Sequence, residues 1–189
     1  MKSFVWVTLC LVLLVGCAHL ERPGGEIYPF RAEFTARGTV QSSELSLQGA
    51  ILLTSAETGI IQTYGPGGLA TGTIDIAPGR LVIKDMWGRS TDTVELPLHG
   101  IIGLMAGDLP HSAYLYKMKA EGGMKVVYPW GSLFIDEEVL PREVHVSGEK
   151  PLDVVMTPSG RSIDLVVNYG PDTLWISLLV IQGGGWISS

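Results

Sequence analysis

The sequence predicts a mainly β domain built from short antiparallel strands, with short helices. Apolar and polar residues alternate in many short segments, which is the period of a strand with one buried and one wetter face. Gly and Pro, 24 and 11 in number, fall repeatedly between these segments, where tight turns need them. Only one later segment has apolar residues at helical spacing instead.

Each predicted strand is justified by alternation, by a bounding turn, or by both. Phe30, Ala32, Phe34 and Ala36 alternate with charged and polar residues, and Pro78-Gly79 and Pro158-Ser159-Gly160 supply turns. The last apolar run fits a strand or a helix, and its length and the following glycines favour a strand. The predicted strands are 30–37, 45–53, 59–64, 72–76, 81–85, 115–119, 125–128, 144–146, 152–156, 162–167 and 174–181.

The segment Thr93 to Leu109 predicts a short apolar helix. Leu98, Ile101 or Ile102, and Met105 recur at helical spacing, whereas the glycines at 100, 103 and 107 weaken any helix there. A single helical turn is also expected at Asp136 to Leu140.

The N-terminus has the pattern of an export signal. Lys2 supplies a positive charge, and Phe4 to Val15 is an apolar segment too short for a comfortable transmembrane helix. It runs into Leu14-Val15-Gly16-Cys17, which resembles the lipobox of bacterial lipoproteins. The resemblance implies that Cys17 becomes the mature N-terminus and carries a diacylglyceryl group and a further acyl chain such as palmitate.

This pattern divides the chain into three predicted parts: a signal peptide at 1–16, a lipidated Cys and tether at 17–29, and a single domain at 30–189. Cys10 would leave with the signal, so no disulfide is expected in the mature chain. Ala18 follows the lipidated Cys, and the lipoprotein sorting rule then implies the outer membrane, with the domain facing the periplasm.

Several function classes are disfavoured. The net charge of −6 and the scattered bases give no basic stripe for nucleic acid. The histidines at 19, 99, 111 and 145 lack metal-ligand spacing, so neither a metal nor a cofactor is expected. No nucleophile, base and orienting group can be assembled from neighbouring motifs, so the chain is not expected to be an enzyme.

The order of the pieces resembles the LolA/LolB superfamily of periplasmic lipoprotein carriers and receptors. Ala36-Arg37-Gly38-Thr39-Val40 is similar to an early strand motif of LolB, and Tyr64-Gly65-Pro66-Gly67-Gly68 to its passage from strand to loop. Leu96 to Pro110 falls where its helical insert would lie. The resemblance implies a curved antiparallel sheet or half-barrel, with the insert as a lid over a hydrophobic cavity for acyl chains.

The resemblance also implies a membrane-contact loop, in which Leu69 matches an exposed leucine that aids delivery to the membrane. Leu69 could equally tuck back into the core. Each residue proposed to line the cavity would also suit a filled hydrophobic core. These residues are Phe34, Leu47, Ile61, Ile74, Ile83, Ile101 and Met105.

Two functional hypotheses follow. In the first, the chain is a non-enzymatic outer-membrane lipoprotein that binds lipid or lipoprotein acyl chains in the cavity, with a role in lipoprotein localisation. In the second, it is a structural or assembly lipoprotein with a filled interior, which docks onto an envelope protein partner through an edge strand or apolar loops.

Overall fold

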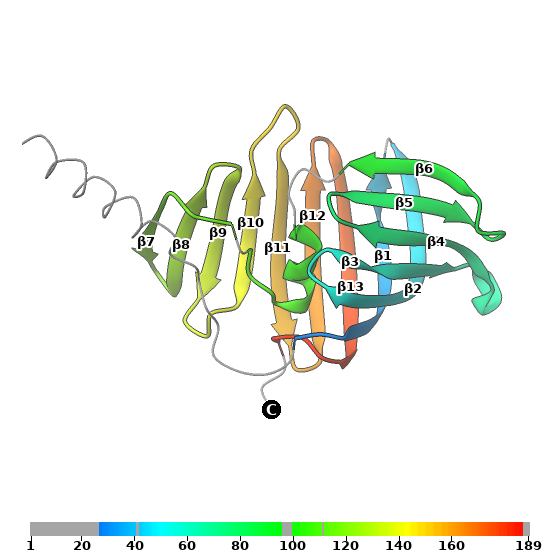
Figure 1. Ribbon diagram of the computed structural model, residues 1–189, viewed down its shortest axis with the longest axis horizontal. Coiled ribbons are helices and arrows are strands. Elements are labelled where there is room, and N and C mark those ends of the chain that lie inside the picture. The colour runs from blue at the N-terminus through cyan, green and yellow to red at the C-terminus, as the bar shows by residue number, and fades with distance from the viewer. Residues whose placement is uncertain (1–26, 41, 96–99, 111, 187–189) are drawn as a thin grey trace, which may run out of the picture.

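The computed structural model describes residues 27–40, 42–95, 100–110 and 112–186. They form one curved, unclosed antiparallel sheet of 13 strands with two short 3₁₀ helices (Figure 1). The predicted mainly β fold is confirmed. The predicted signal peptide, the lipidation site at Cys17 and most of the tether lie outside the described residues.

The strands run consecutively along the chain except where the two helices intervene. Helix η1 spans Pro66–Gly68 and η2 spans Ile101–Ala106. The strands are β1 (Phe30–Val40), β2 (Ser43–Ser55), β3 (Thr58–Tyr64), β4 (Ala70–Ala77), β5 (Arg80–Asp85), β6 (Ser90–Glu95), β7 (Tyr116–Ala120), β8 (Gly123–Tyr128), β9 (Gly131–Asp136), β10 (Pro141–Val146), β11 (Leu152–Ser159), β12 (Ser162–Tyr169) and β13 (Asp172–Gln182).

The sheet consists of two arms that meet at its centre. The strand order is β6-β5-β4-β3-β2-β1-β13-β12-β11-β10-β9-β8-β7. The chain therefore starts at the centre, builds one arm outward to β6, passes through η2 to the far edge at β7, and returns inward to pair β13 with β1. Both arms curve toward the same side, on which η2 lies (Figure 1).

Alternation along the strands produces one apolar inner face. The register aligns Ile51, Ile61, Ile74 and Ile83 in a single row across β2 to β5. In the other arm, Leu178 on β13 pairs with Ile163 on β12, and both side chains are fully buried. Burial of this face supplies the main driving force for the fold.

Two strands were not predicted from the sequence. Strand β6 is polar and exposed along its whole length, so it lacks the apolar alternation that marks a strand. The prediction that Thr93–Glu95 belong to the helical segment is therefore wrong. Strand β9 follows directly on the tight Pro129-Trp130 connection from β8, and the sequence analysis does not predict it.

One predicted helix is shorter than expected, and the other is a turn. Within the described part of 93–109, only Ile101–Ala106 is helical, and it is a 3₁₀ helix bounded by Gly100 and Gly107, both at positive φ. Leu98 lies outside the described residues. Residues 137–140 form a tight turn between β9 and β10, not a helical turn. No helix in the described part of the chain is long and apolar enough to cross a bilayer.

Candidate functional site: an apolar cavity beneath η2

Helix η2 is fastened to the inner side of the sheet at its C-terminal end. The indole Nε1–H of Trp186 donates a hydrogen bond to the carbonyl oxygen of Met105 at 2.9 Å. The backbone N–H of Gly185 donates to the carbonyl of Ala106 at 2.7 Å. The residues that follow β13 therefore hold the end of η2 in place.

A second attachment joins η2 to the start of the domain. The Tyr28 hydroxyl donates a hydrogen bond to Oδ2 of Asp108, two residues beyond the end of η2, at 2.9 Å. Burial, together with the negative charge and the hydrogen bond of Asp108, raises the pKa of Tyr28 well above its usual value. The phenol therefore remains protonated and keeps this hydrogen bond over the whole physiological range.

An apolar cavity of about 180 Å³ lies between η2 and strands β10 to β13. All of its lining side chains are aliphatic or methionine, so no lining side chain offers a hydrogen bond to a polar ligand. The lining residues are Ile101, Ile102, Leu104, Met105, Val144, Leu152, Val154, Met156, Leu165, Val167 and Ile176.

Several of these side chains are incompletely buried although they point inward. Ile102, Met105 and Val154 are all half-buried, whereas Leu165 at the floor is fully enclosed. A core without a cavity would enclose such residues on all sides, because protein interiors are close-packed. This unfilled apolar surface is the property expected of a site for a hydrocarbon group.

The apolar inner face continues beyond the cavity into the other arm. The register aligns Met156, Leu165 and Ile176, which line the cavity, with Ala36 and Leu47 in one row across five neighbouring strands. Leu47 is 36% exposed although it lies on this inner face. A hydrocarbon chain that extended out of the cavity along this row would therefore remain on apolar surface.

The residues predicted from the sequence to line a cavity separate into three groups. Ile101 and Met105 line the cavity beneath η2. Leu47, Ile61, Ile74 and Ile83 lie on the inner face of β2 to β5 but do not line that cavity. Phe34 also belongs to the inner face, and its ring packs over Gly49 on β2.

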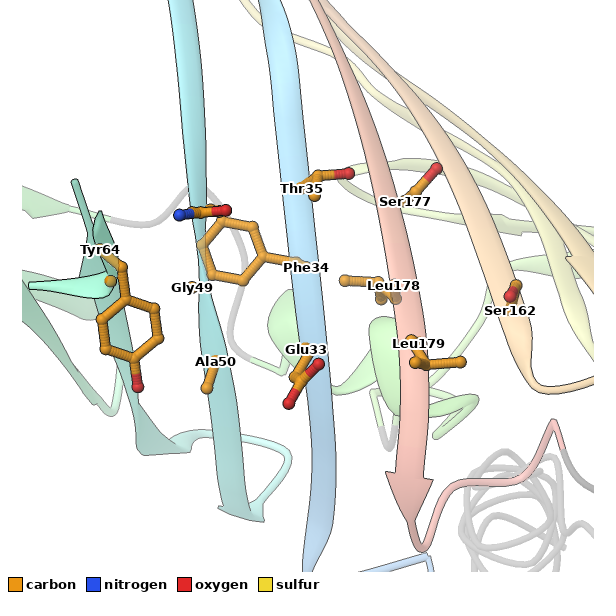
Figure 2. A pocket seen from close by; sticks show the side chains of 12 residues that line it. Glu33, Phe34, Thr35, Gly49, Ala50, Tyr64, Ser162, Ser177, Leu178 and Leu179 are labelled. Carbon is orange, nitrogen blue, oxygen red and sulfur yellow. The ribbon is translucent and has the colours of Figure 1, made fainter. Parts of the chain in front are cut away.

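Phe34 borders a second, larger hollow of about 540 Å³ (Figure 2). Most of the other side chains around it, such as those of Glu33, Thr35 and Gln48, stand on the opposite face of the sheet from η2. This outer hollow is lined by a carboxylate, hydroxyls and an amide as well as by apolar groups. It is therefore a poor site for a hydrocarbon, despite its size.

Most of the cavity lining was not predicted from the sequence. The lining residues of β11, Leu152, Val154 and Met156, occupy every second position, and Leu165 and Val167 do the same on β12. This alternation was recognised as strand pattern. The sequence does not indicate that β10 to β13 supply the strand side of the cavity, because their position in the sheet depends on the long-range pairing of β13 with β1.

The loop between β3 and β4 exposes Leu69, whose side chain is 74% accessible. Gly67 and Gly68 both have positive φ, and the loop is closed by hydrogen bonds from Gly65 N–H to the carbonyl of Leu69 and from Gly68 N–H to the carbonyl of Gly65. Leu69 therefore does not tuck back into the core.

The described residues contain no group of three or more His, Cys, Asp or Glu side chains placed to hold a metal ion. Of the four histidines, only His145 is described, and its Nδ1 lies 2.6 Å from Oδ1 of Asp153 on the outer face of the sheet. This pair is about half exposed and lies on the face opposite the cavity.

No protein-family model and no curated protein sequence matches the chain. Its fold is similar to that of a solved structure described as a LolA superfamily protein, NE2245 from Nitrosomonas europaea. The two share 9% sequence identity with a TM-score of 0.50, over 79% of this chain and 83% of that one. At this identity the likeness concerns the fold, an open and curved antiparallel sheet.

Proposed function

We propose that this protein is a non-enzymatic envelope lipoprotein that binds an acyl chain in the cavity beneath η2. The observation that carries the proposal is the cavity lining, which consists entirely of aliphatic side chains and methionine and leaves several of them incompletely buried. The similar fold of a LolA superfamily protein supports the same reading, because the sequence motifs resemble the same superfamily, which is one of lipoprotein carriers and receptors.

The size of the cavity defines how a ligand would enter. A dry apolar cavity of roughly 150 Å³ accepts a molecule of about the size of benzene, so 180 Å³ holds only a short part of an acyl chain. A longer chain would either extend out of the cavity along the apolar row of the inner face or displace η2 from the sheet. Gly100 and Gly107, with φ of 77° and 75°, bound η2 at the two places where the backbone would have to turn.

Apolar burial would supply the affinity. Each methylene transferred from water to such a cavity contributes about 0.8 kcal/mol before the cost of moving η2 is subtracted. With no polar group from a lining side chain, the site would select for hydrocarbon and not for a headgroup. Suitable ligands are the acyl chains of lipoproteins, or of free lipids such as a diacylglycerol or palmitate, and a role in lipoprotein localisation would follow.

The proposed location is the periplasmic face of the outer membrane. Its basis is the lipobox-like Leu14-Val15-Gly16-Cys17 with Ala18 behind it. Lipid on Cys17 would anchor the chain, because several acyl chains together hold a protein at a bilayer firmly. Leu69, exposed at the tip of its loop, would then contact the membrane with which the ligand is exchanged.

Native mass spectrometry tests the cavity. The chain from Ala18 onward would be produced in a bacterial periplasm, and any bound lipid identified by extraction. We expect a stoichiometric lipid in the wild type and its loss in Met105→Glu, because a carboxylate in the cavity would have no partner among the lining side chains.

The matched control is Val155→Glu. Val155 lies on β11 between the cavity residues Val154 and Met156, but its side chain points to the outer face and is 41% exposed. This variant should retain the lipid. A wild type that is free of lipid and takes up none when it is offered would contradict the proposal.

A second candidate function is favoured by the open edges of the sheet. Strands β6 and β7 each pair with only one neighbour in the described sheet, and all side chains of β6 are exposed. An unpaired edge can accept a strand from another protein. An assembly role of this kind is the better explanation if the cavity proves to bind no lipid.

A further inference from the structure

A second exposed apolar tip lies close to the loop that carries Leu69. It is the hairpin between β5 and β6, where Met86 is 62% exposed and Trp87 71% exposed. Large apolar side chains in contiguous exposed positions mark surfaces that bind something. The proposed cavity function makes no use of this hairpin.

The strand register places the two tips side by side. Thr63 on β3, Gly72 on β4 and Asp85 on β5 lie in one row. The loop with Leu69 leads directly into β4, and Met86 directly follows β5, the strand paired with β4. Figure 1 shows both tips at the same end of the molecule, at the right of the view.

The hairpin tip is held in a defined turn. Oδ1 of Asp85 accepts hydrogen bonds from the backbone N–H groups of Trp87 at 2.9 Å and Arg89 at 3.0 Å. The Arg89 guanidinium also bonds Oδ2 of Asp85, with Nε at 2.9 Å. Because this turn is already ordered, presenting Met86 and Trp87 to a binding surface costs little further conformational entropy.

The charges at the two tips are compatible with an anionic surface. Residues 64–74 and 86–91 contain no carboxylate, in a chain whose net charge is −6. Desolvation acts to raise the pKa of Asp85, but the hydrogen bonds from Arg89 and Trp87 outweigh it and lower that pKa. The negative charge of Asp85 is thus paired with the positive charge of Arg89. The Arg89 guanidinium also lies over the Trp87 ring, 5.0 Å from the ring centroid.

We propose that Leu69, Met86, Trp87 and Arg89 form a membrane-docking surface that inserts into the interface of a lipid bilayer. The surface consists of two projecting tips, whose shape fits a deformable lipid layer better than a preformed protein groove. Trp side chains are favoured at the boundary between hydrocarbon and headgroups, and an adjacent Arg can reach the phosphates. The inference rests on the proposed function for the lipid anchor and for the membrane contact of Leu69, and it adds the hairpin with Met86, Trp87 and Arg89.

The chain length before the domain permits this contact at the anchoring membrane. Phe30 lies in the same row as Gly59 at the start of β3, and the tips lie about 20 Å away at the other end of that strand, at about 3.3 Å per residue. Residues 17–29 span at most about 45 Å when fully extended. A lipid on Cys17 and the two tips can therefore reach the same bilayer.

Fluorescence quenching by brominated lipids tests the proposal on the mature lipidated chain, which begins at Cys17 and so lacks Trp6. The protein would be reconstituted into vesicles of phosphatidylethanolamine and phosphatidylglycerol, with and without bromine on the acyl chains. We expect the quenched part of the tryptophan emission to fall by at least half in Trp87→Phe. The matched control is Trp175→Phe, because Trp175 is also exposed, at 54%, but lies on the outer face of β13; this variant should leave quenching unchanged.

Two further variants separate docking from ligand binding. Leu69→Glu, on the neighbouring tip, should reduce the quenching of Trp87 at least twofold while leaving the far-ultraviolet circular dichroism unchanged. Met105→Glu should leave quenching intact even though it empties the cavity. Equal quenching in the wild type and Trp87→Phe would overturn the docking surface, and would leave the cavity proposal untouched.

Discussion

Tyr128 is a buried phenol whose hydroxyl finds no hydrogen-bond partner among the described residues. It is 2% exposed, and its ring stacks on that of Trp130 with centroids 4.6 Å apart. Burial, followed by the electrostatic effect of Tyr114, raises its pKa from 10.0 to about 12. The ring contributes to the core, whereas the hydroxyl opposes folding.

We therefore expect Tyr128→Phe to stabilise the protein. An unsatisfied buried polar group costs roughly 1–3 kcal/mol. At about 2–4 °C per kcal/mol for a domain of this size, removing it should raise the melting temperature by about 2–12 °C. Differential scanning calorimetry at pH 7 measures the change. Tyr116→Phe is the control, because Tyr116 is 51% exposed and its hydroxyl can remain hydrated.

The same residue predicts a pH dependence. The raised pKa means that the phenol holds its proton more tightly in the folded chain than in the unfolded one. Ionisation of this phenol therefore leaves the free energy of unfolding unchanged below pH 10 and lowers it as the pH rises from 10 to about 12, where the unfolded phenol ionises before the folded one. Urea titrations across this range should show a shallower decline in Tyr128→Phe, and identical declines would contradict the assignment.

Helix η2 shows why the sequence predicted this element only in part. The apolar spacing of Ile101 and Met105 was enough to locate it, and both residues line the cavity. The glycines at 100 and 107 then limit it to a short 3₁₀ segment, because both adopt positive φ. Local pattern thus located the element and its inward residues, but not its length.

Gly103 is the residue of η2 that lies closest to Ala56, in the turn between β2 and β3. A Cβ at this position would lie 2.9 Å from the Cβ of Ala56 and 2.9 Å from the hydroxyl oxygen of Tyr28. Gly103→Ala should therefore push η2 away from the β2–β3 turn and reduce the free energy of unfolding by about 1–3 kcal/mol.

Urea unfolding would measure this loss against Gly148→Ala as control, where the nearest atom to an added Cβ is 3.8 Å away. Equal stability of the Gly103 and Gly148 variants would show that η2 is not held as closely as the geometry indicates.

At the scale of the whole molecule, the sequence predicted most strands but not how they are ordered. Alternation along each segment is a local property, so it identified eleven strands and missed only the polar β6 and the short β9. The pairing of β1 with β13 joins the two ends of the domain, and nothing in either strand alone specifies it. The position of β10 to β13, which supply the strand residues of the cavity, depends on that pairing. Those residues could therefore not be assigned from the sequence.

The sheet order also predicts how stability is distributed. Strands β1 and β13 lie at the centre, each paired on both sides, whereas β6 and β7 are the two edges. Amide hydrogens that are paired and buried exchange only through large openings, whereas those at an edge exchange through local fraying. We therefore expect hydrogen exchange to be slowest in peptides from 30–40 and 172–182 and at least tenfold faster in peptides from 90–95.

This exchange experiment also bears on the second candidate function, because it reports on what covers an edge. The isolated chain should show fast exchange in both β6 and β7. If β6 exchanged as slowly as β13 in the isolated chain, the open sheet order would be wrong. Hydrogen exchange in β6 could instead become slow only when cell-envelope membranes are present, with no lipid bound in the cavity. Pairing of an envelope protein with this edge would then be a better explanation of the function than lipid carriage.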